Sequence, residues 1–138
     1  MTQLLGTGHA LPAHMITNDE MSTFVDTSDE WIQSHTGVKA RHYIKEETAL
    51  SLCLEASEKA LEMAGLEAKD LGLIVCATLS ADHLTPSLSC ELLKALGAFC
   101  PAFDLNAACT GFIYASKIAP ATVPDKPVLV VGCEVLSR

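Results

Sequence analysis

Three short apolar runs alternate with helix-forming stretches in the second half of the chain, and this alternation constrains the fold more than any other feature. The runs are LGLIVCAT at 71–78, AFCPAFDL at 98–105 and PVLVVG at 127–132. One predicted helix, at about 87–96, ends at Gly97, and another follows Phe112 and must stop near Pro120. Strands that alternate with helices favour a parallel sheet. We therefore expect an α/β domain with a mixed, mostly parallel sheet and helices on both faces.

The clearest helix spans Thr48 to Ala64. Apolar or small residues fall on one face, at 50, 53, 54, 57, 60, 61 and 64, and charged residues fall on the other. Gly65 is a natural C-cap for this helix. The stretch is thus predicted to be amphipathic and to pack on the sheet.

The first 47 residues carry weaker signals. Gln3 to Gly8 is predicted to be a first strand, and Val38 to Ile44 has the alternation of another. Asn18 and Ser28 are predicted helix N-caps. Two short helices should therefore flank Asp26 and Thr27.

The composition excludes several classes of protein. The 138 residues are 49% hydrophobic and 19% charged, which suits one globular domain over 1–138. No apolar run approaches the roughly 20 residues that span a bilayer, and no secretory signal is recognisable, so we expect a cytoplasmic protein without a membrane partner. The net charge of −8 and nine scattered Lys and Arg residues argue against nucleic-acid binding.

The six cysteines form no CxxC pair. Most of them stand among Leu, Val and Ala, where a free thiol behaves as a small buried hydrophobe, so we expect core positions and no disulfide framework. The exception is Cys109, which lies between an apolar strand and a helix at a corner of small residues. There the helix dipole and the unpaired N–H groups favour a negatively charged sulfur and can bind an oxyanion. Cys109 is the candidate nucleophile, with a structural cysteine as the alternative.

Several strings strengthen that hypothesis. FDLNAACTGF around Cys109 and DTSDEWIQSHTGVKARH at 26–42 resemble the motifs of ketoacyl-ACP synthase III, a thiolase-fold condensing enzyme. GTGHALP, AGLEAKDLGLIVCATLSADHLTPS and LVVGCEVLSR keep the same order and nearly the same spacing. The resemblance covers essentially the whole chain and corresponds to the N-terminal half of that family.

The resemblance implies a two-step reaction without a cofactor. Cys109 takes an acyl group from acyl-CoA, and the carbanion left when malonyl-ACP loses carbon dioxide then attacks the acyl thioester. Trp31 would stack on the adenine of CoA, with Thr27 beside it. His35 stands where the family usually has an arginine. Thr85 occupies a position at the far end of the acyl pocket where many members carry Phe, which predicts room for a longer acyl chain.

The family's decarboxylating His and Asn belong to its second half, and the five histidines here do not match that motif. We therefore expect a second polypeptide that supplies the C-terminal half and the basic surface for acyl carrier protein. The resemblance also implies that the strand before Cys109 pairs with its twofold mate. Two alternatives stay open: an acyltransferase that passes the acyl group to a non-malonyl acceptor, and a non-catalytic scaffold or dimerisation half.

Overall fold

The computed structural model describes residues 3–137, which form two compact units. The larger unit contains residues 3–10 and 48–136, and the smaller unit contains residues 11–47 and 137. No helix in the described part of the chain is long and apolar enough to cross a membrane.

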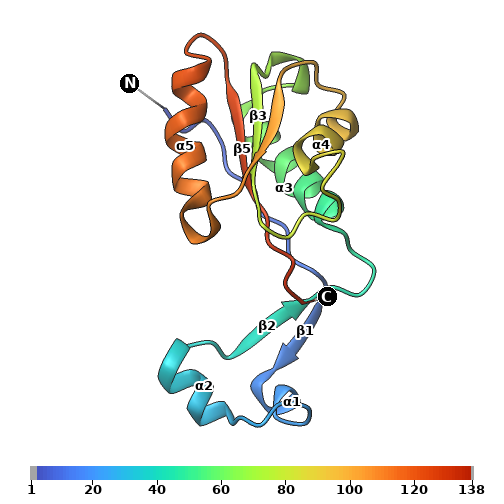
Figure 1. The fold of residues 1–138 in the computed structure, drawn as a ribbon, viewed down its shortest axis with the longest axis vertical. Coiled ribbons are helices and arrows are strands. Elements are labelled where there is room, and N and C mark those ends of the chain that lie inside the picture. Colours follow the sequence, from blue (N-terminus) through green and yellow to red (C-terminus); the bar gives the residue numbers. More distant parts are fainter. Residues whose placement is uncertain (1–2, 138) are drawn as a thin grey trace. The chain divides into compact units, whose positions relative to one another are not determined.

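The larger unit is built on a parallel sheet of three strands. β3 (Leu73–Ala77) lies between β4 (Ala102–Leu105) and β5 (Val128–Gly132) and pairs in parallel with both (Figure 1). All five residues of β3 are buried, which explains why its sequence is apolar without alternation. The strands lie within the three predicted apolar runs, and the parallel sheet is confirmed.

Helices cover both faces of this sheet, as the sequence predicts. α5 (Gly111–Thr122) packs on one face, whereas α3 (Ala49–Ala64) and α4 (Leu88–Leu96) pack on the other (Figure 1). Two 3₁₀ turns complete the unit, η1 (Ala68–Asp70) and η2 (Ala108–Thr110). Under α5 the buried core comprises Leu73, Val75, Ala77, Ala115 and Ala119.

The predicted helix ends are confirmed in α3 and α4. Thr48 caps α3 by accepting a hydrogen bond from Ser51 N, and Gly65 and Gly97 end α3 and α4 in the left-handed conformation, with φ of 65° and 70°. The predicted stop near Pro120 is also confirmed, because α5 ends at Thr122, although Pro120 itself lies inside the last turn. Proline removes one N–H donor, but in the last turn the next bonds still form, as when Val123 N donates to Ala119 O.

The smaller unit consists of a hairpin and two short helices. β1 (His14–Thr17) pairs antiparallel with β2 (Ala40–Tyr43), and between them lie α1 (Asn18–Met21) and α2 (Asp29–Thr36). β2 falls within the predicted 38–44 strand, whereas β1 was not predicted. Ser28 is confirmed as an N-cap, but the prediction for Asn18 is wrong: Thr17 is the N-cap and forms a capping box with Glu20.

The predicted first strand, Gln3 to Gly8, is also wrong, because this segment pairs with no strand in the described chain. Gly6 and Gly8 of this segment instead pack closely against the backbone of α3. A Cβ atom at Gly6 would overlap the carbonyl oxygen of Ala60, and one at Gly8 would overlap that of Ala56. Close approach to a helix, and not strand pairing, therefore accounts for these two glycines.

Candidate active site

Cys109 lies at the predicted corner between a strand and a helix. β4 ends at Leu105, the chain turns through Asn106 and Ala107, and Cys109 is the middle residue of η2, directly before α5. Its side chain is exposed. The corner stands at the carboxyl ends of the parallel strands, the edge at which open α/β sheets bind their ligands.

The backbone at this corner is strained. Ala108 has a φ of 45°, and it is the one residue other than glycine with positive φ in the part of the chain that the structure describes. A side chain in the left-handed region costs roughly 1–2 kcal/mol. Strain of this kind gathers at functional sites, where the surrounding structure holds it. Here it turns the chain so that the next residue, Cys109, is presented to solvent.

The N-terminus of α5 is left open. In the other four α-helices of the described chain, the side chain of the N-cap accepts a hydrogen bond from the first turn. Thr110 does not cap α5, because its hydroxyl donates to Ala107 O at 2.8 Å. The positive end of the helix dipole next to Cys109 is thus not neutralised by a cap, which suits an anionic sulfur or an oxyanion.

Glu134 connects the segment that follows β3 to the segment that follows β5, at the same edge of the sheet. Its carboxylate accepts hydrogen bonds from Leu79 N at 3.0 Å and Ser80 Oγ at 2.6 Å, and Val135 N donates to Ser80 Oγ at 2.8 Å. The sequence analysis missed this residue. The available signal was a charged residue soon after a buried strand, at the carboxyl end where sites form.

Thr85 belongs to the same unit as Cys109. It lies exposed in the loop between β3 and α4, which begins at the carboxyl end of β3. The neighbouring Leu84 is 97% exposed. The structure thus puts Thr85 in a loop at the edge of the sheet that also carries Cys109.

Trp31 and Thr27 belong to the smaller unit. Trp31 is in the first turn of α2 and is 55% exposed, and one face of its indole is stacked on His35, with centroids 4.3 Å apart and planes at 21°. Thr27 precedes the N-cap Ser28, and its Oγ1 is buried without a hydrogen-bond partner among the described residues. Trp31 is thus covered in part by His35 and remains accessible to solvent.

A polar network holds α2 in place. Asn18, 1% exposed, donates to Asp29 Oδ1 at 2.8 Å and to Val38 O at 2.7 Å, at the two ends of the helix. Arg41 Nη2 in turn donates to Asn18 Oδ1 at 2.8 Å. Hydrogen bonds from Asn18 and Gln33 hold the pKa of Asp29 below its ordinary value. Sequence analysis mistook Asn18 for a cap, although the pattern Thr17-x-x-Glu20 is the signal of a capping box.

The remaining cysteines divide by burial. Cys53, Cys76 and Cys133 are buried as predicted, Cys100 is partly buried, and the prediction for Cys90 is wrong because it is exposed on α4. The hydrogen bond with Cys133 lowers the pKa of Cys53, but contact with Cys76 and burial outweigh it and raise that pKa to about 12. The bond with Cys53 and burial raise the pKa of Cys133. These thiols are poor nucleophiles.

Comparison with known proteins gives similar sequences and similar structures. Residues 103–138, which include Cys109, match the family model 3-oxoacyl-[acyl-carrier-protein (ACP)] synthase III. The beta-ketoacyl-[acyl-carrier-protein] synthase III of Vesicomyosocius okutanii is 47% identical over 140 residues, covering 99% of this chain and 44% of that protein.

Solved structures give the same result. The 3-oxoacyl-[acyl-carrier-protein] synthase III of Aquifex aeolicus superposes with a TM-score of 0.94 at 42% identity, over 99% of this chain and 46% of that chain. The priming beta-ketosynthase of the R1128 polyketide pathway gives a TM-score of 0.92 at 36% identity, over 98% and 42%. The chain thus spans less than half the length of the relatives that it matches.

The fold is thiolase-like, and the sequence and structure comparisons make the chain a homologue of condensing enzymes. Within that class, the chain is a homologue of beta-ketoacyl-ACP synthase III.

Proposed function

We propose that this chain is the acyl-accepting half of a synthase III-type condensing enzyme, with Cys109 as the nucleophile. One observation carries the proposal: Cys109 is exposed on a strained corner beside the uncapped N-terminus of α5. The alternative of a scaffold gives no reason for a strained backbone next to a reactive side chain.

In the first step, the Cys109 thiolate attacks the thioester carbonyl of an acyl-CoA. The carbonyl oxygen becomes an oxyanion, which the N–H groups at the start of α5 stabilise. The intermediate collapses, the bond to the CoA sulfur breaks, and a proton converts the departing thiolate to free CoA. The acyl group then remains on Cys109 as a new thioester.

In the second step, malonyl-ACP loses carbon dioxide and the resulting carbanion attacks the acyl-Cys109 thioester. A carbon–carbon bond forms, the Cys109 thiolate leaves, and the product is a ketoacyl-ACP. We assign the decarboxylating His and Asn to the part of the enzyme that this chain does not span. That part also carries the basic surface for the acidic carrier protein, since this chain has a net charge of −8.

Substrate binding involves three further residues in this proposal. The exposed face of Trp31 stacks on the adenine of CoA, and Thr27 lies beside it. His35 occupies the other face of Trp31. Thr85 lines the far end of the acyl pocket, where its small side chain leaves room for an acyl group longer than acetyl.

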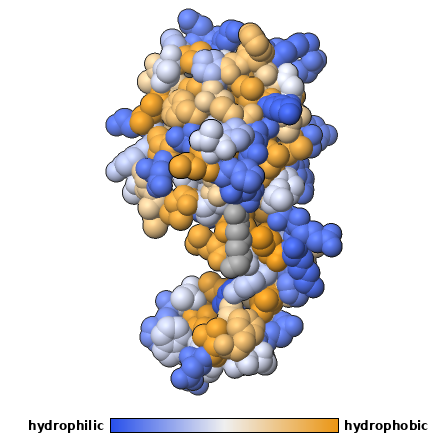
Figure 2. Space-filling view, turned by 45° about the vertical axis from the view of Figure 1, so that its right-hand side comes forward, coloured by the Kyte–Doolittle hydropathy of each residue, from blue (hydrophilic) through white to orange (hydrophobic). Residues whose placement is uncertain are grey.

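We also propose that β4 pairs with its twofold mate. β4 is an edge strand of the described sheet, and exposed apolar strand edges are normally covered. Apolar residues reach the surface of the molecule among polar ones (Figure 2). Near β4, Phe99 is 99% exposed and Phe103 is 39% exposed. Both would be buried by such pairing.

The first step is tested by incubating the chain with an acyl-CoA series and measuring intact mass. One acyl adduct is expected, and Cys109→Ala should abolish it. Cys90→Ala is the matched control because Cys90 is the other exposed cysteine of the described chain, and it should leave the adduct unchanged. An adduct that persists in Cys109→Ala would contradict the role assigned to Cys109.

The second step is tested with malonyl-ACP and the complete enzyme. Release of carbon dioxide from malonyl-ACP, in step with loss of the acyl adduct, supports condensation. Loss of the adduct to another acceptor without carbon dioxide release would favour the acyltransferase alternative. If Cys109 is alkylated no faster than Cys90 at neutral pH and takes no acyl group, the scaffold alternative is favoured.

A further inference from the structure

The loop between β3 and α4, residues 78–87, begins at the same edge of the sheet as the Cys109 corner. Thr78 N donates to Leu105 O at 3.2 Å, so the first residue of the loop is bonded to the last residue of β4. The loop carries Thr85, to which we assign the far end of the acyl pocket. The geometry of the loop therefore bears on which acyl groups fit.

The tip of this loop is apolar and exposed. Leu84 is 97% exposed and Leu79 is 50% exposed, although apolar side chains gain free energy by burial. Thr85 and Pro86, which follow Leu84, are exposed as well. A loop without restraints could fold back and bury the two leucines, so interactions at the ends of the loop must hold its tip outward.

Glu134 holds the start of the loop. Its Oε1 accepts a hydrogen bond from Leu79 N at 3.0 Å, and its Oε2 accepts one from Ser80 Oγ at 2.6 Å. Val135 N donates in turn to Ser80 Oγ at 2.8 Å. These hydrogen bonds fix the start of the loop to the segment that follows β5.

Asp104, on β4, holds the end of the loop. Its Oδ2 accepts a hydrogen bond from Leu88 N at 2.9 Å, and its Oδ1 accepts one from Ser89 N at 2.8 Å. Leu88 and Ser89 are both 0% exposed. The helix α4 also has its own N-cap, because Ser87 Oγ accepts a hydrogen bond from Cys90 N. Asp104 therefore adds to this cap a link between the end of the loop and the strand that leads into the candidate active site.

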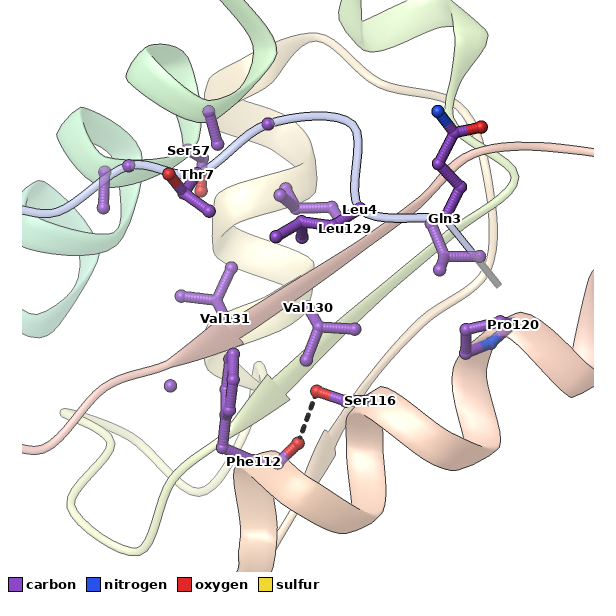
Figure 3. Close-up of a pocket in the computed structure, with 16 residues that line it drawn as sticks. Gln3, Leu4, Thr7, Ser57, Phe112, Ser116, Pro120, Leu129, Val130 and Val131 are labelled. Atoms are coloured by element: carbon purple, nitrogen blue, oxygen red, sulfur yellow. Dashed lines mark hydrogen bonds between the residues drawn. The ribbon is translucent and has the colours of Figure 1, made fainter. Parts of the chain in front are cut away.

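The pocket shown in Figure 3 is separate from this loop. Its walls are residues of β5, α3, α5 and the segment Gln3–Gly8, and Phe112 and Ser116 of α5 point toward β5. The lining includes neither Cys109 nor any residue from 78 to 87. An acyl group whose length is limited by the loop therefore does not lie in this pocket.

We propose that Asp104 and Glu134 are positioning residues for acyl-chain selectivity. They fix the two ends of loop 78–87, so the tip that carries Thr85 acts as a rigid wall and limits the length of the acyl group on Cys109. This inference rests on the proposed function, because it takes Thr85 as part of the acyl pocket. It adds two carboxylates that touch no substrate and act only through the loop.

The two carboxylates should respond differently to replacement by an amide. Both donors to Asp104 are backbone N–H groups, so Asp104→Asn loses one acceptor and turns its own N–H group toward another. Glu134 binds one N–H group and one hydroxyl, and a hydroxyl can also accept, so Glu134→Gln can keep both hydrogen bonds. Asp104→Asn and Glu134→Ala should therefore free the loop, and Glu134→Gln should not.

Selectivity is measured in the complete enzyme as the rate of acylation at Cys109, followed by intact mass. A series from acetyl-CoA to lauroyl-CoA first finds the chain length beyond which the wild-type rate falls. The rate with the first chain beyond this limit, divided by the rate with the last chain within it, should rise by roughly tenfold in Asp104→Asn and Glu134→Ala. This is the lower end of what one methylene group contributes to discrimination. The ratio should keep its wild-type value in Glu134→Gln.

Asp70→Asn is the matched control. Asp70 Oδ2 also accepts a hydrogen bond from a backbone N–H group, that of Glu67, but it lies before the start of β3, at the opposite end of the strand from the loop. The control should leave the ratio unchanged. A general loss of stability lowers both rates together, so it does not alter the ratio.

Amide hydrogen exchange measures the two attachments without acyl-CoA. Exchange at Leu88 or Ser89 should be roughly tenfold faster or more in Asp104→Asn, as expected for the loss of a hydrogen bond to a charged group. Exchange at Leu79 should be faster by a similar factor in Glu134→Ala and not in Glu134→Gln. Unchanged exchange in both Asp104→Asn and Glu134→Ala would overturn the proposal, because the loop would not depend on the carboxylates.

The outcomes separate this inference from the proposed function. If the wild type is acylated at Cys109 but has no length limit, or if Asp104→Asn and Glu134→Ala keep its limit, only the positioning role is contradicted. If the wild type takes no acyl group, the proposed function fails and this inference fails with it. The Glu134 pair keeps the test decisive if Asp104→Asn does not fold, since equal length limits in Glu134→Ala and Glu134→Gln would overturn the proposal.

Discussion

The two units of this chain are specified by different interactions. In the larger unit, buried apolar residues fill both faces of a sheet, among them Leu73, Ile74, Leu88 and Leu92. In the described smaller unit, the one buried apolar residue is Ile32, at 8% exposure, and the one buried polar residue is Asn18. The difference teaches that burial specifies the larger unit, whereas individual hydrogen bonds specify the smaller one.

The two units can also be followed separately. The chain has one tryptophan, Trp31, so its fluorescence reports the smaller unit. The longer helices α3, α4 and α5 belong to the larger unit and dominate the helical circular dichroism signal. Each prediction below uses this pair of signals to ask which unit a substitution affects.

The largest effect is expected from Leu92→Ala, in the core of the larger unit. Leu92 is 0% exposed, and removing its side chain leaves a cavity that should cost about 2–5 kcal/mol of unfolding free energy. Urea unfolding followed by circular dichroism measures it. Leu93→Ala on the same helix is the control and should cost less, since Leu93 is only partly buried. Equal losses would contradict the role of burial.

A smaller but more local effect is expected from Asn18→Leu. The substitution leaves Asp29, Val38 O and Arg41 without a common partner, which should cost about 1–3 kcal/mol. The Trp31 fluorescence transition should move to lower urea, and the helical signal should change less. Asp19→Asn, an exposed change in the same helix, serves as the control. If the two variants unfold alike, the network is not what holds α2.

The capping boxes give a matched comparison between the units. Thr48→Ala removes the cap of α3 and Thr17→Ala removes that of α1, and each should cost about 1 kcal/mol. Thr48→Ala should move the circular dichroism transition and Thr17→Ala the fluorescence transition. Thr→Ser at both positions keeps the hydroxyl and should restore stability. A Thr17→Ala variant that moves only the circular dichroism transition would show that the two signals do not report the two units separately.

The same contrast explains what the sequence could predict. Continuous apolar runs predicted β3 and β5, and the capping glycines predicted the ends of α3 and α4, because these features depend on local pattern. β1 and the Asn18 network depend on partners 11 to 29 residues away, and pattern does not reveal them. Gln3–Gly8 was predicted as a strand because its sequence suits one, but within the described chain it has no strand partner.

The sequence likewise predicts some features of the candidate site and not others. The corner at Cys109 was predicted from small residues between a strand and a helix. The positive φ of Ala108 and the non-capping hydroxyl of Thr110 were not, because Thr is usually a good N-cap. Both depend on how the chain leaves β4. Glu134 acts through loops that lie more than 50 residues away in sequence.

The smallest effect, and the most specific, is expected from Glu47→Gln. Backbone N–H groups of Lys45 and Ala13 lower the pKa of Glu47 from 4.5 to about 2, because they bind its charged form. A lowered pKa in the folded state stabilises the fold above pH 4.5, and this contribution is lost as the pH falls toward 2.

The wild type should therefore be more stable than Glu47→Gln, as measured by the fluorescence transition. This difference in stability should be full at pH 7 and shrink between pH 4.5 and 2. Glu46→Gln, a change of the same kind at the neighbouring residue, is the control. If the difference between the wild type and Glu47→Gln is the same at every pH, the charge of Glu47 does not stabilise the smaller unit. Individual polar contacts would then contribute less to the stability of the smaller unit than we infer.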